Sequence, residues 1–215
     1  MNKIDAQFAA MARENAMELQ FPSVLPHATL ERAGYFEAFP DGAIPAGDGY
    51  LFMPAVCYHC YAQWVGERLR APRAVTCVGR CHRNEFDPPA RLREFTMREI
   101  VFVGPPEWVV EQRQMWMARI EAFASSLELP ATMQVATDPF FGGESRGKRL
   151  LQQVKELKYE LRVGSMAIAS FNLHETHFAK RFDIALVDGR TAHTGCVAFG
   201  LERWELALEA GCDLR

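Results

Sequence analysis

The feature that most constrains the fold is a pair of apolar segments joined by a polar connection. Ala74–Val78 and Glu99–Val103 carry the β-branched and apolar residues that are typical of strands. The residues between them are rich in Arg, Asp and Pro, the composition of an exposed connection. The three segments together predict two strands joined as a hairpin, and therefore an antiparallel sheet.

Hydrophobic periodicity predicts helices and further strands around this hairpin. The predicted helices are 1–20, Tyr58–Leu69 and Glu107–Leu127, the predicted strands are Leu157–Val163, Met166–Phe171 and Phe182–Val187, and Cys196–Ala210 is predicted to pass from a strand into a helix. Strands outnumber strand–helix–strand units, which favours an antiparallel α+β domain. With 215 residues, of which 49% are hydrophobic, we expect residues 1–215 to form a single domain.

Charge and composition argue against several classes of protein. No run approaches eighteen apolar residues, and Asp5, Arg13 and Glu14 interrupt the N-terminal apolar positions, so we expect an amphipathic helix there instead of a secretory signal. The net charge of −3 gives no support for a large RNA partner, because nucleic-acid binders usually carry a basic face. We expect a cytoplasmic protein whose six cysteines are thiols or metal ligands.

Arginine side chains crowd the predicted hairpin connection. They are Arg80, Arg83, Arg91 and Arg93. The planar guanidinium group suits bidentate contacts with phosphate or carboxylate, and Phe95 offers a flat face for a base. From spacing alone, a nucleotide site and a solvated hairpin with scattered charges are both open.

The C-terminal segment HTGCVAFGLERWELAL contains a motif that resembles one of a known enzyme class. Within it, Gly200–Arg203 resembles the Gly-x-Glu-Arg of the third motif of class II aminoacyl-tRNA synthetases. Arg83–Glu85, followed by Phe95, resembles the Arg-x-Glu of their second motif. The segment 21–40 (FPSVLPHATLERAGYFEAFP) is similar to the region around their first, dimer-forming motif. The resemblance covers most of the chain and implies the class II catalytic fold, an antiparallel sheet backed by helices, in a homodimer.

Within that class, the chain resembles the atypical seryl-tRNA synthetases and their shortened relatives, the amino acid:[carrier protein] ligases. The segments that carry this likeness are PAVCY (54–58), MREIVFVG (97–104), ATDPFF (136–141), SFNLHETHFAKRFDI (170–184) and HTGCVAFGLERW (193–204). In this branch a zinc ion captures the amino group of the substrate, and the matching ligand positions are Cys57, Glu99 and Cys196. Two thiolates and a carboxylate suit tetrahedral zinc with one position left open. The resemblance also implies that Asn172 and His174 lie near the substrate.

Two other patterns compete with this zinc site or imitate a phosphate site. A closed structural zinc site is an open alternative, with a CxxC and a CxxxC pattern made by Cys57, Cys60, Cys77 and Cys81. The segment 142–149 (GGESRGKR) imitates a phosphate loop, but Arg149 stands where the magnesium-binding Ser or Thr belongs. We therefore expect a basic surface turn at that segment.

The resemblance also implies how ATP binds. The ATP-binding positions are Arg83, Glu85, Leu92, Phe95 and Arg203. Arg83 is expected to hold the α-phosphate, where charge builds as the amino-acid carboxylate attacks, and Glu85 is expected to accept from the adenine amino group. Phe95 and Arg203 are expected to sandwich the base, and Arg203 to reach the γ-phosphate. Magnesium (Mg2+) is expected to bridge the phosphates.

The resemblance implies an acceptor as well. The shortened ligases aminoacylate the phosphopantetheine thiol of a carrier protein, and only about fifty residues precede Cys57, so we expect a carrier protein and no tRNA-binding arm. A candidate docking surface for an acidic carrier is the basic run Arg146, Lys148, Arg149, Lys155 and Lys158. The related ligases favour glycine or alanine, which we expect over serine. A paralogue that acts on tRNA and a non-catalytic amino-acid-binding paralogue are the alternatives.

Overall fold

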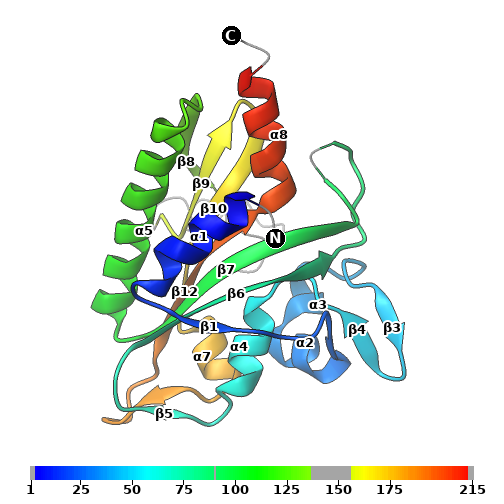
Figure 1. The fold of residues 1–215 in the computed structure, drawn as a ribbon. Helices are drawn as coiled ribbons and strands as arrows, with labels where there is room; N and C mark the ends of the chain where they lie inside the picture. Colours follow the sequence, from blue (N-terminus) through cyan, green and yellow to red (C-terminus); the bar gives the residue numbers. More distant parts are fainter. Residues whose placement is uncertain (1–2, 90, 137–155, 213–215) are drawn as a thin grey trace.

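The computed structural model describes residues 3–89, 91–136 and 156–212 and is built around one large sheet (Figure 1). The sheet has seven strands in the order β1-β6-β7-β12-β10-β9-β8. Along the chain they are β1 (Met17–Leu19), β6 (Arg73–His82), β7 (Glu94–Gly104), β8 (Ala131–Ala136), β9 (Lys158–Val163), β10 (Met166–Glu175) and β12 (His193–Gly200). Neighbouring strands are antiparallel except β1 and β6, which are parallel. The predicted antiparallel α+β fold is confirmed.

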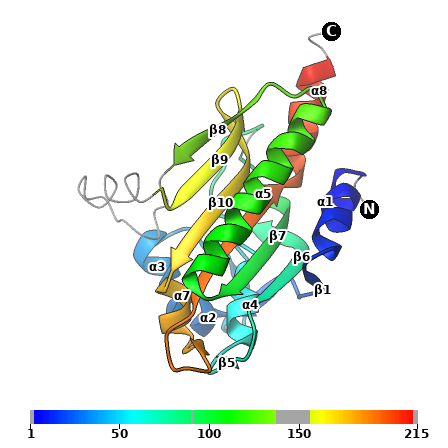
Figure 2. The ribbon, with the colours of Figure 1, turned by 90° about the vertical axis from the view of Figure 1, so that its left-hand side faces the viewer.

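Helices cover both faces of this sheet, and each face has its own core (Figures 1 and 2). One face carries α1 (Lys3–Arg13), α5 (Pro106–Ser126) and α8 (Leu201–Cys212), and the other carries α2 (His27–Ala33), α3 (Tyr35–Ala38), α4 (Cys57–Gln63) and α7 (His177–Arg181). The first core includes Phe8, Trp116 and Trp204, and the second includes Tyr61 and Phe178. Because side chains alternate along a strand, one sheet supplies both cores.

Two small sheets lie beside the second group of helices. In one, β4 (Tyr50–Phe52) pairs with both β2 (Val24–Pro26) and β3 (Pro45–Gly47), and in the other β5 (Arg68–Leu69) pairs with β11 (Ala185–Leu186). Strands of two or three residues are too short to show a period, so the sequence predicted neither sheet, although β11 lies within a predicted strand. In the part of the chain that the structure describes, no helix has the length and apolar character needed to span a bilayer.

The predicted N-terminal helix is wrong in its extent. It ends at Arg13, and Met17–Leu19 forms β1 beside β6 instead of two further helical turns. Asn15 and Ala16 both donate to the Ala12 carbonyl, which turns the chain away from the helix axis. Pairing with the sheet edge thus overrides the helical periodicity of this segment.

Left-handed backbone residues shorten two other predicted elements. The helix predicted over Tyr58–Leu69 ends at Gln63 and is followed by Gly66 at a φ of +74°, which a right-handed helix does not contain. The strand predicted over Phe182–Val187 keeps only β11, because Asp183, at a φ of +53°, turns the chain first. The other predicted helices and strands are confirmed, and β6, β7 and β10 are longer than predicted.

Gly195 on β12 has no room for a side chain. A Cβ atom there would lie against the Phe102 ring and 2.7 Å from the Asn172 carbonyl oxygen. We expect Gly195→Ala to lower the free energy of unfolding by about 1–3 kcal/mol, because the neighbouring groups must move apart. Thermal unfolding measures this loss. Gly200→Ala on the same strand is the control, since a Cβ there meets no atom closer than 3.7 Å; an equal loss in both variants would contradict the steric reason.

Candidate active site

The sheet face that carries α4 contains a cavity of about 430 Å³. Its walls include every residue that the sequence assigns to ATP, substrate or zinc. These residues are Cys57, Arg83, Glu85, Leu92, Phe95, Glu99, Asn172, His174, Cys196 and Arg203. They come from α4, the β6–β7 connection, β7, β10, β12 and α8, so the fold gathers segments that are far apart in the sequence (Figure 1).

Strand register explains why several of these side chains share one face. Cys196 on β12 lies opposite Asn172 on β10, and Asn172 lies opposite Lys158 on β9. Glu99 on β7 lies opposite Ala198, two residues from Cys196. Residues directly opposite each other, and residues two apart on one strand, point to the same face of a sheet. The polar residues among them therefore form one wall of the cavity.

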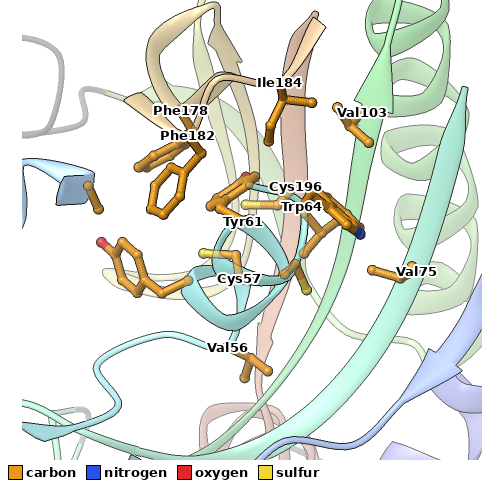
Figure 3. Close-up of a cluster of buried hydrophobic side chains, with 14 of the residues drawn as sticks. Val56, Cys57, Tyr61, Trp64, Val75, Val103, Phe178, Phe182, Ile184 and Cys196 are labelled. Atoms are coloured by element: carbon orange, nitrogen blue, oxygen red, sulfur yellow. The ribbon is translucent and has the colours of Figure 1, made fainter. Parts of the chain in front are cut away.

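Cys57, Glu99 and Cys196 meet at a buried end of this cavity. The Cys57 backbone N–H donates to Glu99 Oε2 at 2.6 Å, and the thiols of Cys57 and Cys196 are hydrogen-bonded to each other and to the Glu99 carboxyl group. The bond to Cys196, together with burial, raises the pKa of the Cys57 thiol, and burial raises the pKa of Glu99. Figure 3 shows the two thiols, one from α4 and one from the sheet. The structure thus brings the three predicted zinc ligands into contact.

Asn172 and His174 extend this cluster along β10. Asn172 Nδ2 donates to Cys196 Sγ at 3.4 Å, and His174 Nε2 lies 3.6 Å from the same sulfur. Burial lowers the pKa of His174 to about 3, so its imidazole is neutral near pH 7. Asn172 is 6% exposed, and its Oδ1 has no hydrogen-bond partner among the described residues. A buried acceptor of this kind in a cavity wall is suited to an N–H group of a ligand.

The fit of these groups to a metal depends on donor type and on geometry. Among the residues that the structure describes, no set of three or more His, Cys, Asp or Glu side chains is arranged to hold a metal ion. The closed alternative of Cys57, Cys60, Cys77 and Cys81 is not among such sets either, so among the described residues it has no support. Cys57, Glu99 and Cys196 have the donor types that zinc prefers, but hydrogen bonds link them, and binding would displace the thiol protons. Zinc stays a prediction.

The predicted phosphate and base contacts form the other end of the cavity. Arg83 Nε donates to the Pro54 carbonyl at 2.9 Å, and its guanidinium lies 5.2 Å from the centre of the Phe95 ring. Glu85, the predicted adenine acceptor, accepts from Arg91 at 2.9 Å. Arg83 therefore already lies over the Phe95 ring, and an adenine at the predicted position would compete with Arg91 for the Glu85 carboxylate.

Arg203 and Glu202 join the C-terminal motif to the hairpin. Arg203 Nη1 donates to the Ala167 carbonyl at 3.0 Å, and burial, with a further contribution from Arg83, lowers its pKa. Both carboxylate oxygens of Glu202 accept from the Thr96 backbone N–H, at 2.7 and 2.9 Å. The start of α8 is thereby fixed against β7, which brings the two predicted nucleotide motifs to one cavity.

Other cavity residues were not predicted. They include Tyr35, Tyr58, Glu160 and Ser170. Lys158, predicted as a docking residue, also lines the cavity, where its ammonium lies 3.4 Å from Glu160 and its side chain is 18% exposed. The other residues of the predicted docking run (Arg146, Lys148, Arg149 and Lys155) lie outside the described residues, as does the 142–149 segment. Side chains alternate between the two faces of a strand. In the predicted strand Leu157–Val163, this alternation was the one sequence signal that Lys158 and Glu160 lie on the same face.

The chain is similar to two proteins of Bradyrhizobium diazoefficiens over most of its length. Amino acid–[acyl-carrier-protein] ligase 1 is 32% identical over 230 residues, which cover 88% of this chain and 70% of the relative. Amino acid–[acyl-carrier-protein] ligase 2 is 31% identical over 245 residues, which cover 97% and 73%. The chain belongs to this ligase family. No protein-family model matches it.

More distant relatives identify the fold. The type-2 serine–tRNA ligase of Methanocaldococcus jannaschii is 31% identical over 172 residues, which cover 73% of this chain but 33% of that protein. M. kandleri SerRS, solved in complex with A. aeolicus tRNASec, superposes with a TM-score of 0.79 at 24% identity over 93% of this chain and 49% of its own. Seryl-tRNA synthetase from Pyrococcus horikoshii, solved with ATP, gives 0.77 at 15% identity, over 95% and 48%. The class II synthetase fold is therefore confirmed, and the chain spans about half of each solved structure.

Proposed function

We propose that this protein activates a small amino acid with ATP and transfers it to the phosphopantetheine thiol of a carrier protein. One observation carries the proposal: a single cavity of about 430 Å³ holds cationic and aromatic side chains suited to a nucleotide beside a buried cluster suited to an amine. Membership of the amino acid–[acyl-carrier-protein] ligase family supports the carrier protein as acceptor. The cavity volume lies within the usual range of about 300–1,000 Å³ for small-molecule sites.

In the first step, a carboxylate oxygen of the amino acid attacks the α-phosphorus of ATP, and the bond to pyrophosphate breaks. Arg83 stabilises the charge that develops on the α-phosphate, and Arg203 and Phe95 hold the base between them. Glu85 accepts from the adenine amino group once ATP displaces Arg91. Mg2+ bound with ATP would neutralise phosphate charge, as is usual for nucleotide substrates.

The buried end of the cavity would bind the amino group. Cys57, Glu99 and Cys196 would hold zinc, which when bound supplies an open coordination position for a neutral amine. Asn172 Oδ1, a buried acceptor with no partner among the described residues, would accept an amine N–H. Phe178 and the buried His174 line the same part of the cavity, which favours glycine or alanine over larger side chains.

In the second step, the carrier thiol attacks the carbonyl carbon of the aminoacyl adenylate. The bond between that carbon and the phosphate oxygen breaks, AMP leaves and the thiol proton is released to solvent. A thioester forms, and the cavity must open toward the carrier for the thiol to enter. A homodimer and a cytoplasmic location stay predictions for this protein.

Amino-acid-dependent pyrophosphate exchange across a panel of small amino acids tests the proposal. We expect exchange with glycine or alanine and little with serine. The charging step is then tested with labelled amino acid, ATP and either a phosphopantetheinylated carrier protein or total tRNA. Labelled carrier supports the proposal, whereas labelled tRNA alone would assign the protein to the tRNA-charging alternative. No exchange with any amino acid would favour the non-catalytic paralogue.

The zinc assignment has its own test in Cys196→Ala. We expect this variant to lose bound zinc, measured by mass spectrometry of metal content, and to lose pyrophosphate exchange with it, because one of three ligands is gone. Arg203→Ala is the matched comparison, since it should keep its zinc while the KM for ATP rises. Normal zinc content in Cys196→Ala, or lost zinc in Arg203→Ala, would show that the ligand set is wrong.

A further inference from the structure

Tyr61 on α4 is not among the cavity-lining residues, but it contacts two of them, Phe178 and His174. The side chain is fully buried, with its ring stacked on Phe178 at 4.5 Å and edge-on to Trp64 at 6.2 Å (Figure 3). Its hydroxyl group lies 3.1 Å from His174 Nδ1. A phenylalanine would make the same ring contacts, so the hydroxyl group matters through its contact with His174.

His174 lies between hydroxyl groups on one side and a thiol on the other. Its Nδ1 faces Tyr61 and also Thr194 Oγ1, which is 3.3 Å away, and its Nε2 faces Cys196 Sγ at 3.6 Å. A neutral imidazole has one N–H donor and one acceptor nitrogen, and the partners decide which nitrogen carries the proton. When the phenol, a strong donor, donates to Nδ1, the N–H is on Nε2, which lies 3.6 Å from the sulfur.

Cys196 Sγ then receives two N–H groups from β10. Asn172 Nδ2 donates at 3.4 Å, and in this tautomer His174 Nε2 donates as well, from two residues further along the strand and 3.6 Å away. Both donors act from the β10 side of the sulfur, which leaves its other side facing Cys57 and Glu99. In many protein sites, a residue that does not touch the ligand hydrogen-bonds to a ligand-binding side chain and so fixes its orientation.

We propose that Tyr61 is a positioning residue of this site: its hydroxyl group fixes the tautomer of His174, which orients Cys196 Sγ toward Cys57 and Glu99. This inference rests on the proposed function, because the cluster of Cys57, Glu99 and Cys196 is the part of the cavity proposed to bind the substrate amine. Tyr61 acts only through His174 and touches neither amino acid nor nucleotide. Its loss should therefore weaken binding of the amino acid and leave ATP binding unchanged.

Tyr61→Phe, which removes only the hydroxyl group, tests this inference by kinetics. We expect the KM for the amino acid in pyrophosphate exchange to rise about tenfold, equivalent to about 1.4 kcal/mol, with an unchanged KM for ATP. Tyr159→Phe is the matched control, because its hydroxyl group bonds Glu156 at 2.5 Å and Tyr159 is not a cavity-lining residue. An unchanged amino-acid KM in Tyr61→Phe, or an equal rise for ATP, would overturn the inference.

Nitrogen-15 NMR of the histidine side chains gives a readout that needs no turnover. In the unmodified protein, we expect His174 to be the Nε2–H tautomer, and in Tyr61→Phe we expect that population to fall. His174→Gln assigns the signal. A His174 that is the Nδ1–H tautomer in the unmodified protein would overturn the inference even if Tyr61→Phe fails to fold. A protein without any pyrophosphate exchange would refute the proposed function, while the tautomer would still be measured.

Discussion

Replacing Arg83 by alanine is expected to lower the kcat of pyrophosphate exchange by about 10²–10³-fold, the usual effect of removing one fixed donor from a developing negative charge. Arg83 is held before any nucleotide binds, by the Pro54 carbonyl at 2.9 Å and by the Phe95 ring 5.2 Å away. Because the guanidinium is already in place, little reorganisation opposes its interaction with the α-phosphate. The KM for the amino acid should change little, since the amine is expected at the other end of the cavity.

Two variants separate this role from a structural one. Arg80→Ala on β6 is the matched control, because the Arg80 side chain is 61% exposed and pairs with Glu94, so activity and melting temperature should stay near those of the unmodified protein. Arg83→Lys keeps the charge without the planar fork and should give an intermediate rate. If Arg83→Ala lost activity only in proportion to its loss of folded protein by circular dichroism, the electrostatic role would be contradicted.

The nucleotide end of the site was predictable because its motifs are local in sequence. Arg83–Glu85 and Gly200–Arg203 are each contiguous, and the apolar segments beside them predicted the strands that carry them. What the sequence did not contain is the contact that joins them, the Glu202 carboxylate on the Thr96 backbone N–H. That contact depends on the antiparallel pairing of β7 with β12, which no local pattern specifies.

The cavity wall formed by β9 also depends on strand pairing that the local sequence does not specify. Lys158 and Glu160 are two residues apart on a predicted strand, so alternation alone puts them on one face. Which face that is follows only from the pairing of Lys158 with Asn172, whose side chain also lines the cavity. Charge led to the prediction of Lys158 as a docking residue, and the register shows that it is also part of the cavity wall. Strand order is a non-local property, and composition carries little information about it.

The N-terminal helix also makes a contact that the sequence did not predict, a buried ion pair with the central sheet. Asp5 on α1 pairs with Arg98 on β7 through two contacts, at 2.5 and 3.1 Å, and both side chains are at most 6% exposed. Arg98 also donates to Thr76 Oγ1, which in turn donates to the Glu99 carbonyl. Nothing in the sequence pairs residues 5 and 98, yet together they fix the strand that carries Glu99.

Asp5→Ala is therefore expected to lower the free energy of unfolding by about 3 kcal/mol, because it leaves the Arg98 guanidinium buried without its main partner. This is the low end of the usual range, since Glu18 remains 3.4 Å from Arg98 and is partly exposed. For a chain of this length the melting temperature should fall by about 6–12 °C, measured by calorimetry. Pyrophosphate exchange should fall as well at temperatures where the variant is still folded, because Glu99 loses part of its support.

Two comparisons isolate the buried charge as the cause. Glu14→Ala removes another ion pair of the same N-terminal region, but Glu14 is 62% exposed, so its loss should cost below about 1 kcal/mol. The double replacement Asp5→Leu with Arg98→Met removes both charges and puts apolar side chains in their place, and it should recover most of the stability lost in Asp5→Ala. If the double variant were no more stable than Asp5→Ala, packing of α1 against β7, and not the uncompensated guanidinium, would explain the loss.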